Sequence, residues 1–224
     1  MQLGFIIINK PKGITSHDVI KRLRGITNIK KIGHAGTLDP LATGVLVCAI
    51  GREATKNISK FVKSDKEYIA KIKLGERSDT YDAEGKIEKV SFDEKPALSK
   101  IRKVLKKFTG EIKQTPPVYS AKKIKGKKAY EFARGGEEIK LKPVRVKINK
   151  IDILEYKWPY LKIKTKVSSG TYIRSLANDV GRALGAGGYL ADLKRTIVEN
   201  FSIDDAIRLD SLNKNNWGEY LINL

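Results

Sequence analysis

The chain of 224 residues is poor in the residues that build disulfide, metal and membrane sites. Cys48 is its only cysteine, which excludes an intramolecular disulfide framework and a cysteine-rich zinc site. The two histidines, His17 and His34, add little to a metal site. No apolar run approaches the roughly 20 residues of a membrane span, and the amino terminus has no basic region typical of a signal peptide. We therefore expect a soluble, cytoplasmic protein.

Positive charge is what the chain has in excess. Lysine and arginine number 45 against 25 acidic residues, which gives a net charge of +20 and a pI near 9.9. Such a balance indicates a polyanionic partner, and nucleic acid is the default. A membrane-surface protein would need a basic amphipathic helix with aromatic anchors or a lipidation signal, and neither stands out.

Short apolar runs and helical stripes follow one another along the chain. Alternation and apolar runs predict strands at 4–8, 45–50, 68–74, 86–90, 144–153 and 161–168. Helical spacing predicts a first helix that is capped by Thr15 or Ser16 and ends before Gly25. Further helices are predicted at 53–62, 97–108 and 173–184, with a terminal helix within 204–224. The length allows one large domain or two small ones.

The segment from Gly33 to Gly44 has the most unusual order. Its glycines and Pro40 require a turning backbone, which carries one imidazole, His34, and one carboxylate, Asp39. The apolar run at 45–50 predicts a buried strand that anchors this loop. Asp-Pro is also a common turn dipeptide, so Asp39 taken alone is more often a structural residue.

The whole string Gly-His-Ala-Gly-Thr-Leu-Asp-Pro-Leu-Ala-Thr-Gly-Val-Leu resembles the signature of the TruB-type pseudouridine synthases. Those enzymes isomerise the T-loop uridine of transfer RNA at position 55. The resemblance covers about residues 4–205 and implies that Asp39 is the catalytic carboxylate. It leaves open whether Asp39 attacks the base, attacks C1′ or removes a proton from C2′. His34 is a candidate to fill the stack when the target base is flipped out; as a metal ligand it lacks partners.

Two further strings carry the resemblance. Lys-x-Tyr-x-Ala, at 66–70, makes Tyr68 the tyrosine that stacks on the base and moves its C5 proton, although a strand tyrosine is more often a core residue. Gly-Thr-Tyr-Ile-Arg, at 170–174, pairs Arg174 with Asp39 and packs Tyr172 against the pocket. An arginine in the first turn of a helix is poorly placed for the helix dipole, so it needs another partner such as a buried carboxylate.

Other residues are predicted to contact the substrate. The turn at 9–13 resembles the first motif of the family and includes Lys10, and Leu193 matches the leucine that lines the base pocket. Residues 120–143 resemble the insertion that folds over the T-loop, and the alternative there is a solvated basic face; its predicted RNA contacts are Lys122, Lys123, Lys127 and Lys128. Asp79 and Asp82 lack the calcium-loop pattern, so we expect a turn there and no metal.

By this resemblance the fold is mixed α/β, with a long antiparallel-rich mixed sheet, flanking helices and an active-site cleft across the sheet. We expect one catalytic domain over 1–224, without the separate carboxy-terminal RNA-binding module of most bacterial relatives. The isomerisation has no net redox change, so we expect no cofactor and no metal. The expected partner is the T-arm and T-loop of transfer RNA, bound by a monomer that needs no membrane and no protein partner.

Two other classes of protein could carry this charge. A non-catalytic RNA-folding protein would explain the net charge, but not the coincidence of Asp39, Tyr68 and Arg174 in matching strings. A guide-RNA-dependent synthase of the archaeal and eukaryotic kind shares the same core, but normally has a large carboxy-terminal module. The sequence therefore favours a stand-alone enzyme.

Overall fold

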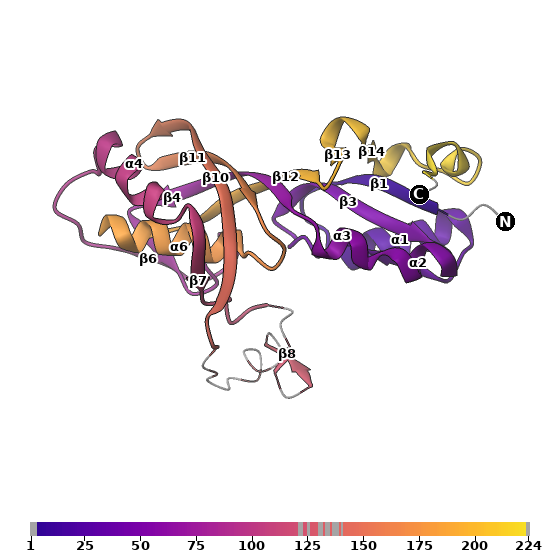
Figure 1. Ribbon diagram of the computed structural model, residues 1–224, viewed down its shortest axis with the longest axis horizontal. Coiled ribbons are helices and arrows are strands. Elements are labelled where there is room, and N and C mark those ends of the chain that lie inside the picture. Colours follow the sequence, from indigo (N-terminus) through magenta and orange to yellow (C-terminus); the bar gives the residue numbers. More distant parts are fainter. Residues whose placement is uncertain are drawn as a thin grey trace. The chain divides into compact units, whose positions relative to one another are not determined.

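The computed structural model describes residues 4–120, 123–124, 126–129, 132, 135, 139 and 141–222. The chain forms two compact units, the first from residues 1–69 and 193–224 and the second from residues 70–192. Two strands, β4 (Lys66–Leu74) and β12 (Gly188–Val198), contribute residues to both units (Figure 1). Within the described ranges, no helix is long and apolar enough to cross a bilayer.

The sheet of the first unit is mixed. The order of its strands is β14, β1, β3, β12 and β4. In addition, β2 pairs with β3, and β13 pairs with β12. Strand β1 is antiparallel to β3, whereas β12 is parallel to it. The bounds are β1 Gly4–Lys10, β2 Ile32–His34, β3 Ala42–Ile50, β13 Phe201–Ser202 and β14 Ile207–Arg208. Strands β1 and β3 bury both faces, one in each of two core clusters, which explains their continuous apolar runs.

Three helices accompany this sheet. Helix α1 (Ser16–Thr27) has the predicted cap, since the Thr15 hydroxyl accepts from the Asp18 amide at 3.1 Å. The predicted end before Gly25 is wrong: the helix continues until Asn28, which adopts a left-handed conformation. The predicted helix at 53–62 is two short helices, α2 (Arg52–Asn57) and α3 (Ser59–Lys63).

The predicted terminal helix is also wrong. Besides strand β14, the described residues 203–222 have only short 3-10 turns in place of a helix, at Ile203–Asp205, Leu209–Ser211 and Trp217–Tyr220. Polar side chains compete with helical backbone bonding there, because Asn213 Oδ1 accepts from the amides of Asn215 and Asn216. Leu209 and Leu212 of this stretch are buried in the core cluster that also contains residues of α1.

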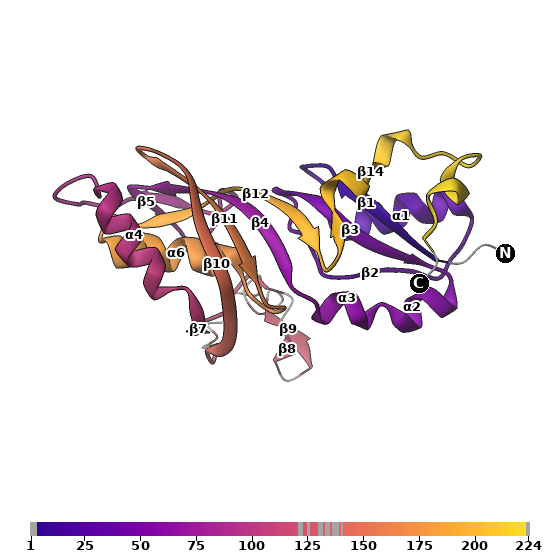
Figure 2. The same cartoon turned by 45° about the horizontal axis from the view of Figure 1, so that its top comes forward.

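The sheet of the second unit has the order β12, β4, β11, β10 and β7. Strands β10 (Val144–Lys157) and β11 (Tyr160–Val167) form an antiparallel hairpin, and β7 (Gly110–Gln114) pairs antiparallel with β10. Helices α4 (Leu98–Lys107) and α6 (Ile173–Leu184) contact each other beside this hairpin (Figure 2). Two small ribbons complete the unit: β5 (Glu76–Ser78) with β6 (Ile87–Lys89), and β8 (Lys123–Ile124) with β9 (Lys127–Lys128). The predicted mixed α/β class, with a large mixed sheet and flanking helices, is confirmed.

Candidate active site

The Asp39 loop is fixed on both sides of the carboxylate. Ser16 Oγ, in the first turn of α1, accepts from the Leu38 amide at 2.8 Å and donates to the Leu38 carbonyl at 3.1 Å. On the other side, the Gly13 amide donates to the Pro40 carbonyl at 2.8 Å. Asp39 itself is half-buried, and its carbonyl accepts from the Ala42 amide at 3.0 Å. The loop therefore presents this side chain from a backbone that is held at three successive residues.

Arg195 closes the same loop from β12. Its side chain is 1% exposed, and its guanidinium donates to the Val45 carbonyl at 2.7 Å and to the Gly36 carbonyl at 3.1 Å. These two carbonyls lie on either side of the Asp39 segment, so one buried cation ties both ends together. This role of Arg195 is not predictable from the sequence, because nothing local to 193–196 indicates a partner so far away along the chain.

The other predicted residues of the first unit lie in or next to strands. Tyr68 is 8% exposed on β4, and Leu193 is 7% exposed where β12 pairs with β3. Lys10 ends β1 and is completely buried, with Nζ donating to the carbonyls of Pro11 and Ile14 at 2.9 and 2.7 Å. Lys10 thus braces the turn that also holds Pro40, and its predicted contact with substrate remains a prediction.

His34 ends β2 and pairs with Cys48 of β3. Its ring is largely buried, and Nδ1 has no hydrogen-bond partner in the described part of the chain. Burial, followed by the positive charge of Arg195, lowers the pKa of His34 below its ordinary value. The imidazole is therefore neutral at pH 7, and a neutral flat ring suits the predicted place in a base stack.

The lowered pKa of His34 predicts a pH-dependent stability. The unfolded chain protonates this imidazole near pH 6.5 while the folded chain resists it, so stability falls as pH falls through that value. His34→Gln should lose less stability than the wild type between about pH 7 and about pH 5 in urea unfolding. The exposed His17, changed to Gln, is the control. Parallel pH profiles for the wild type and His34→Gln would contradict the assignment.

Arg174 lies in the first turn of α6, in the second unit. Its guanidinium pairs with Asp82 at 3.2 Å and donates to the carbonyls of Tyr119 at 2.8 Å and Thr80 at 3.3 Å. Both charged side chains are less than 10% exposed, so Asp82 is a buried carboxylate of the kind that this arginine requires. The predicted pairing of Arg174 with Asp39 remains a prediction.

Tyr172, two residues before Arg174, is held by its backbone. The buried Gln114 side chain accepts from the Tyr172 amide at 2.8 Å and donates to its carbonyl at 3.1 Å. Ser175 Oγ donates to the Thr115 carbonyl at 2.7 Å. The end of β7 therefore sets the start of α6 and, with it, the position of Arg174.

Asp82 lies in the segment that the sequence predicts to be a turn. Its Oδ1 accepts from Thr80 Oγ1 at 2.6 Å and from the Glu84 amide at 3.0 Å, while Oδ2 receives Arg174. The predicted turn is therefore present, and it also places the Asp82 carboxylate within hydrogen-bond distance of Arg174. The available signal was the arginine itself, because a buried guanidinium needs a counter-charge.

Removing that carboxylate should be costly. Asp82→Ala removes the counter-charge of the buried Arg174 guanidinium. We expect this change to lower the free energy of unfolding by about 3 kcal/mol or more. The neighbouring Asp79 is exposed and accepts from the Lys86 amide at 2.8 Å, so Asp79→Ala should cost about 1 kcal/mol. Urea unfolding of both variants makes the comparison; equal losses would mean that the ion pair adds nothing.

Two protein-family models and several relatives match this chain. The model described as TruB family pseudouridylate synthase (N terminal domain) matches residues 24–173, and the model of the tRNA pseudouridylate synthase B C-terminal domain matches residues 174–222. The chain belongs to the TruB family. It is 46% identical over 204 residues to the tRNA pseudouridine synthase B of Protochlamydia amoebophila, covering 91% of this chain and 77% of that protein. For the Clostridium tetani protein of the same name the identity is 44% over 219 residues, covering 98% and 75%.

Solved structures are also similar to this chain. The chain matches a structure titled as a Cbf5-Nop10-Gar1 complex with a TM-score of 0.72 and 32% identity, covering 94% of this chain and 54% of that one. A structure titled as an H/ACA RNP bound to a substrate RNA containing 2′-deoxyuridine matches with a TM-score of 0.69 and 31% identity, covering 93% and 52%. The chain therefore spans about half the length of these solved chains.

The predicted insertion of the TruB family lies partly outside the described residues. This holds for Lys122, and for the side chains of Lys123 and Lys128. Lys127 is exposed, with Nζ 5.9 Å from the centroid of the Phe132 ring. The clasping role of 120–143, and the single-domain organisation of the whole chain, remain predictions.

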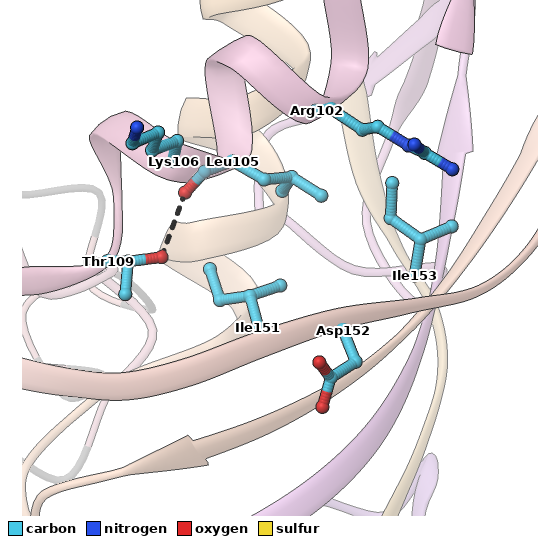
Figure 3. Close-up of a pocket in the computed structure, with 7 residues that line it drawn as sticks. All are labelled: Arg102, Leu105, Lys106, Thr109, Ile151, Asp152 and Ile153. Carbon is cyan, nitrogen blue, oxygen red and sulfur yellow. Dashed lines mark hydrogen bonds between the residues drawn. The ribbon is translucent and has the colours of Figure 1, made fainter. Parts of the chain in front are cut away.

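A groove of about 420 Å³ lies between α4 and β10, apart from these predicted residues (Figure 3). Its lining is Arg102, Leu105, Lys106, Thr109, Ile151, Asp152 and Ile153. Among the residues that the structure describes, no group of three or more histidine, cysteine, aspartate or glutamate side chains could hold a metal ion.

Proposed function

We propose that this TruB-family protein converts uridine to pseudouridine at position 55 in the T-loop of transfer RNA, with Asp39 as the catalytic carboxylate. The observation that carries the proposal is the Asp39 loop, which has the family signature and is held on both sides of the carboxylate by Ser16 and Gly13. The names of the relatives from Protochlamydia and Clostridium support transfer RNA as the substrate. We further propose that the protein acts alone, as a cytoplasmic monomer.

The reaction suits a fixed carboxylate. It breaks the bond from C1′ to N1, turns the uracil and joins C5 to C1′, so atoms and electrons balance without a redox partner. Positive charge develops on the sugar as the first bond breaks, and an ionised carboxylate stabilises that charge whether it attacks or removes a proton. Because the Asp39 backbone is held in place, the carboxylate extends from a fixed position before the base arrives.

Tyr68 and Arg174 supply the remaining roles. Tyr68 is a buried ring with a hydroxyl, which suits stacking on the freed uracil and transfer of its C5 proton. Arg174 supplies a guanidinium, and a cation of this kind keeps a catalytic carboxylate ionised. The net charge of +20 favours association with the phosphate backbone of the substrate.

Release of tritium from unmodified transfer RNA labelled at uridine C5 tests the proposal. The purified chain, with no guide RNA and no second protein added, should release tritium, because the C5 proton must leave before pseudouridine is complete. RNA binding without release would overturn the proposal in favour of an RNA-folding protein. Release only when a guide RNA is added would overturn stand-alone action.

A further inference from the structure

The second unit has a sheet face that is covered by lysines. Side chains alternate along β10 and β11, so one face buries Ile148, Leu161 and Ile163 while the other carries charge. Figure 3 shows Ile151 and Ile153 pointing toward α4 and Asp152 pointing away from it. The outward residues define what we call the lysine face: Lys71, Lys147, Lys150, Lys162, Lys164 and Lys166.

Acidic residues only partly balance this face. Across the strands, Asp152 is opposite Lys164, Glu155 is opposite Lys162 and Glu111 is opposite Lys147. Lys150 is directly opposite Lys166, and Arg145 is directly opposite Lys113 on the same side. Like charges placed directly across an antiparallel pair destabilise a sheet. The folded protein therefore carries a repulsion that a bound polyanion would remove.

The ion pairs on the face do not neutralise it. Lys150 Nζ lies 2.9 Å from Asp152 Oδ2, but these side chains are 70% and 42% exposed. Exposed pairs of this kind contribute little and are screened by salt. The ion pair of Lys150 with Asp152 therefore does not remove the excess of positive charge on the lysine face.

The chemistry of the face fits a nucleic-acid backbone better than unpaired bases. The aromatic ring of Tyr160 already has Lys71 Nζ above it, 4.1 Å from the ring centroid, so that side of the ring is occupied. Lys162, Lys164 and Lys166 repeat every second residue, about 6.6 Å apart, along a surface strand. Double-stranded DNA carries one charge per about 1.7 Å of its axis, and an RNA duplex is likewise densely charged, so several lysines of such a row can reach phosphates at once.

The lysine face is separate from the Arg174 site within the second unit. Arg174 belongs to α6, which contacts α4, and α4 lies on the side toward which Ile151 and Ile153 point. We infer that the lysine face is a second RNA-binding surface, which holds the phosphate backbone of an RNA duplex without reading its sequence. This goes beyond the proposed isomerisation, because it requires no uridine in the bound segment.

The test measures binding of a plain RNA duplex of about 20 base pairs, without a T-loop, over a range of salt concentrations. In one variant Lys162, Lys164 and Lys166 are changed to Gln; in the control the exposed Lys100, Lys103 and Lys107 of α4 are changed to Gln, with the same loss of charge. We expect the first variant to bind at least about tenfold more weakly, with a log–log salt slope smaller by about 2. The control should stay close to the wild type.

Several outcomes would overturn the inference. Equal losses in both variants would mean that total charge, and not this face, holds the RNA. Unchanged duplex binding with lost binding of poly-glutamate would assign the face to an acidic protein. The Lys162, Lys164 and Lys166 variant should keep a thermal midpoint close to that of the wild type, because it removes two cross-strand attractions, to Glu155 and Asp152, and one repulsion, from Lys150, each of them small on an exposed face. A much lower midpoint with weakened binding would count against the inference. Failure of the isomerase assay would leave this duplex measurement standing.

Discussion

Asp39→Asn is expected to lower the rate of tritium release by about a thousandfold or more. Asparagine keeps the shape of the side chain but cannot act as a nucleophile or base, and it carries no charge to stabilise the sugar as the glycosidic bond breaks. A thousandfold loss corresponds to about 4 kcal/mol of transition-state stabilisation. Single-turnover release from labelled transfer RNA measures it.

The control for Asp39→Asn is the same chemical change at Asp210, which is exposed and pairs with Arg208 on the surface of the first unit. Asp210→Asn should keep the wild-type rate. RNA affinity should change little in either variant, because the loss at Asp39 concerns chemistry and not binding. An Asp39→Asn enzyme that kept a tenth of the wild-type rate would show that another group is the catalytic carboxylate.

Gly44→Ala is expected to have the largest effect on stability. Gly44 pairs with Arg195 across parallel strands and has φ of +102°, a conformation that side chains rarely adopt. A Cβ atom added there would lie 2.1 Å from the Arg195 carbonyl oxygen and 2.9 Å from its amide nitrogen. Since both neighbours are backbone, the strands must separate, and we expect a loss of about 3–5 kcal/mol and a thermal midpoint lower by roughly 10 °C.

Gly110 offers a matched control for Gly44. Its φ is +99°, but nothing lies within 4 Å of an added Cβ atom. Gly110→Ala therefore carries only the conformational cost, about 1–2 kcal/mol. Thermal unfolding of both variants separates that cost from the overlap with Arg195. Equal losses at the two positions would mean that the close approach of β3 and β12 does not matter for stability.

Local patterns predicted the longer helices and the strands β1, β3, β4, β6, β10 and β11, but not the long strand β12. The apolar runs of β1 and β3, the capped start of α1 and the stripe of α6 each depend on neighbouring residues, so the sequence carries their signal. The errors arise because the same local signals do not record contacts with the rest of the protein. Glycine is only a weak helix breaker, and α1 passes through Gly25 because buried contacts continue to Thr27. The terminal stretch was predicted as a helix, but its asparagine side chains bond to the backbone instead.

The candidate site was predictable where one string held the residues. Asp39 and His34 stand within a single signature, and Arg174 stands in another. The contacts that position them were not predictable, because they join distant parts of the chain: Arg195 to Val45, Ser16 to Leu38 and Arg174 to Asp82. Such pairs depend on the packing of whole elements, which no local pattern records.

The most direct test of the account is to find where pseudouridine forms. The purified chain is incubated with an unmodified transfer RNA transcript labelled at uridine C5, and with a matched transcript in which position 55 is cytidine. We expect release of one tritium per molecule of the first transcript, pseudouridine at position 55 and no release from the second. Equal release from both transcripts, or no release from either, would contradict it.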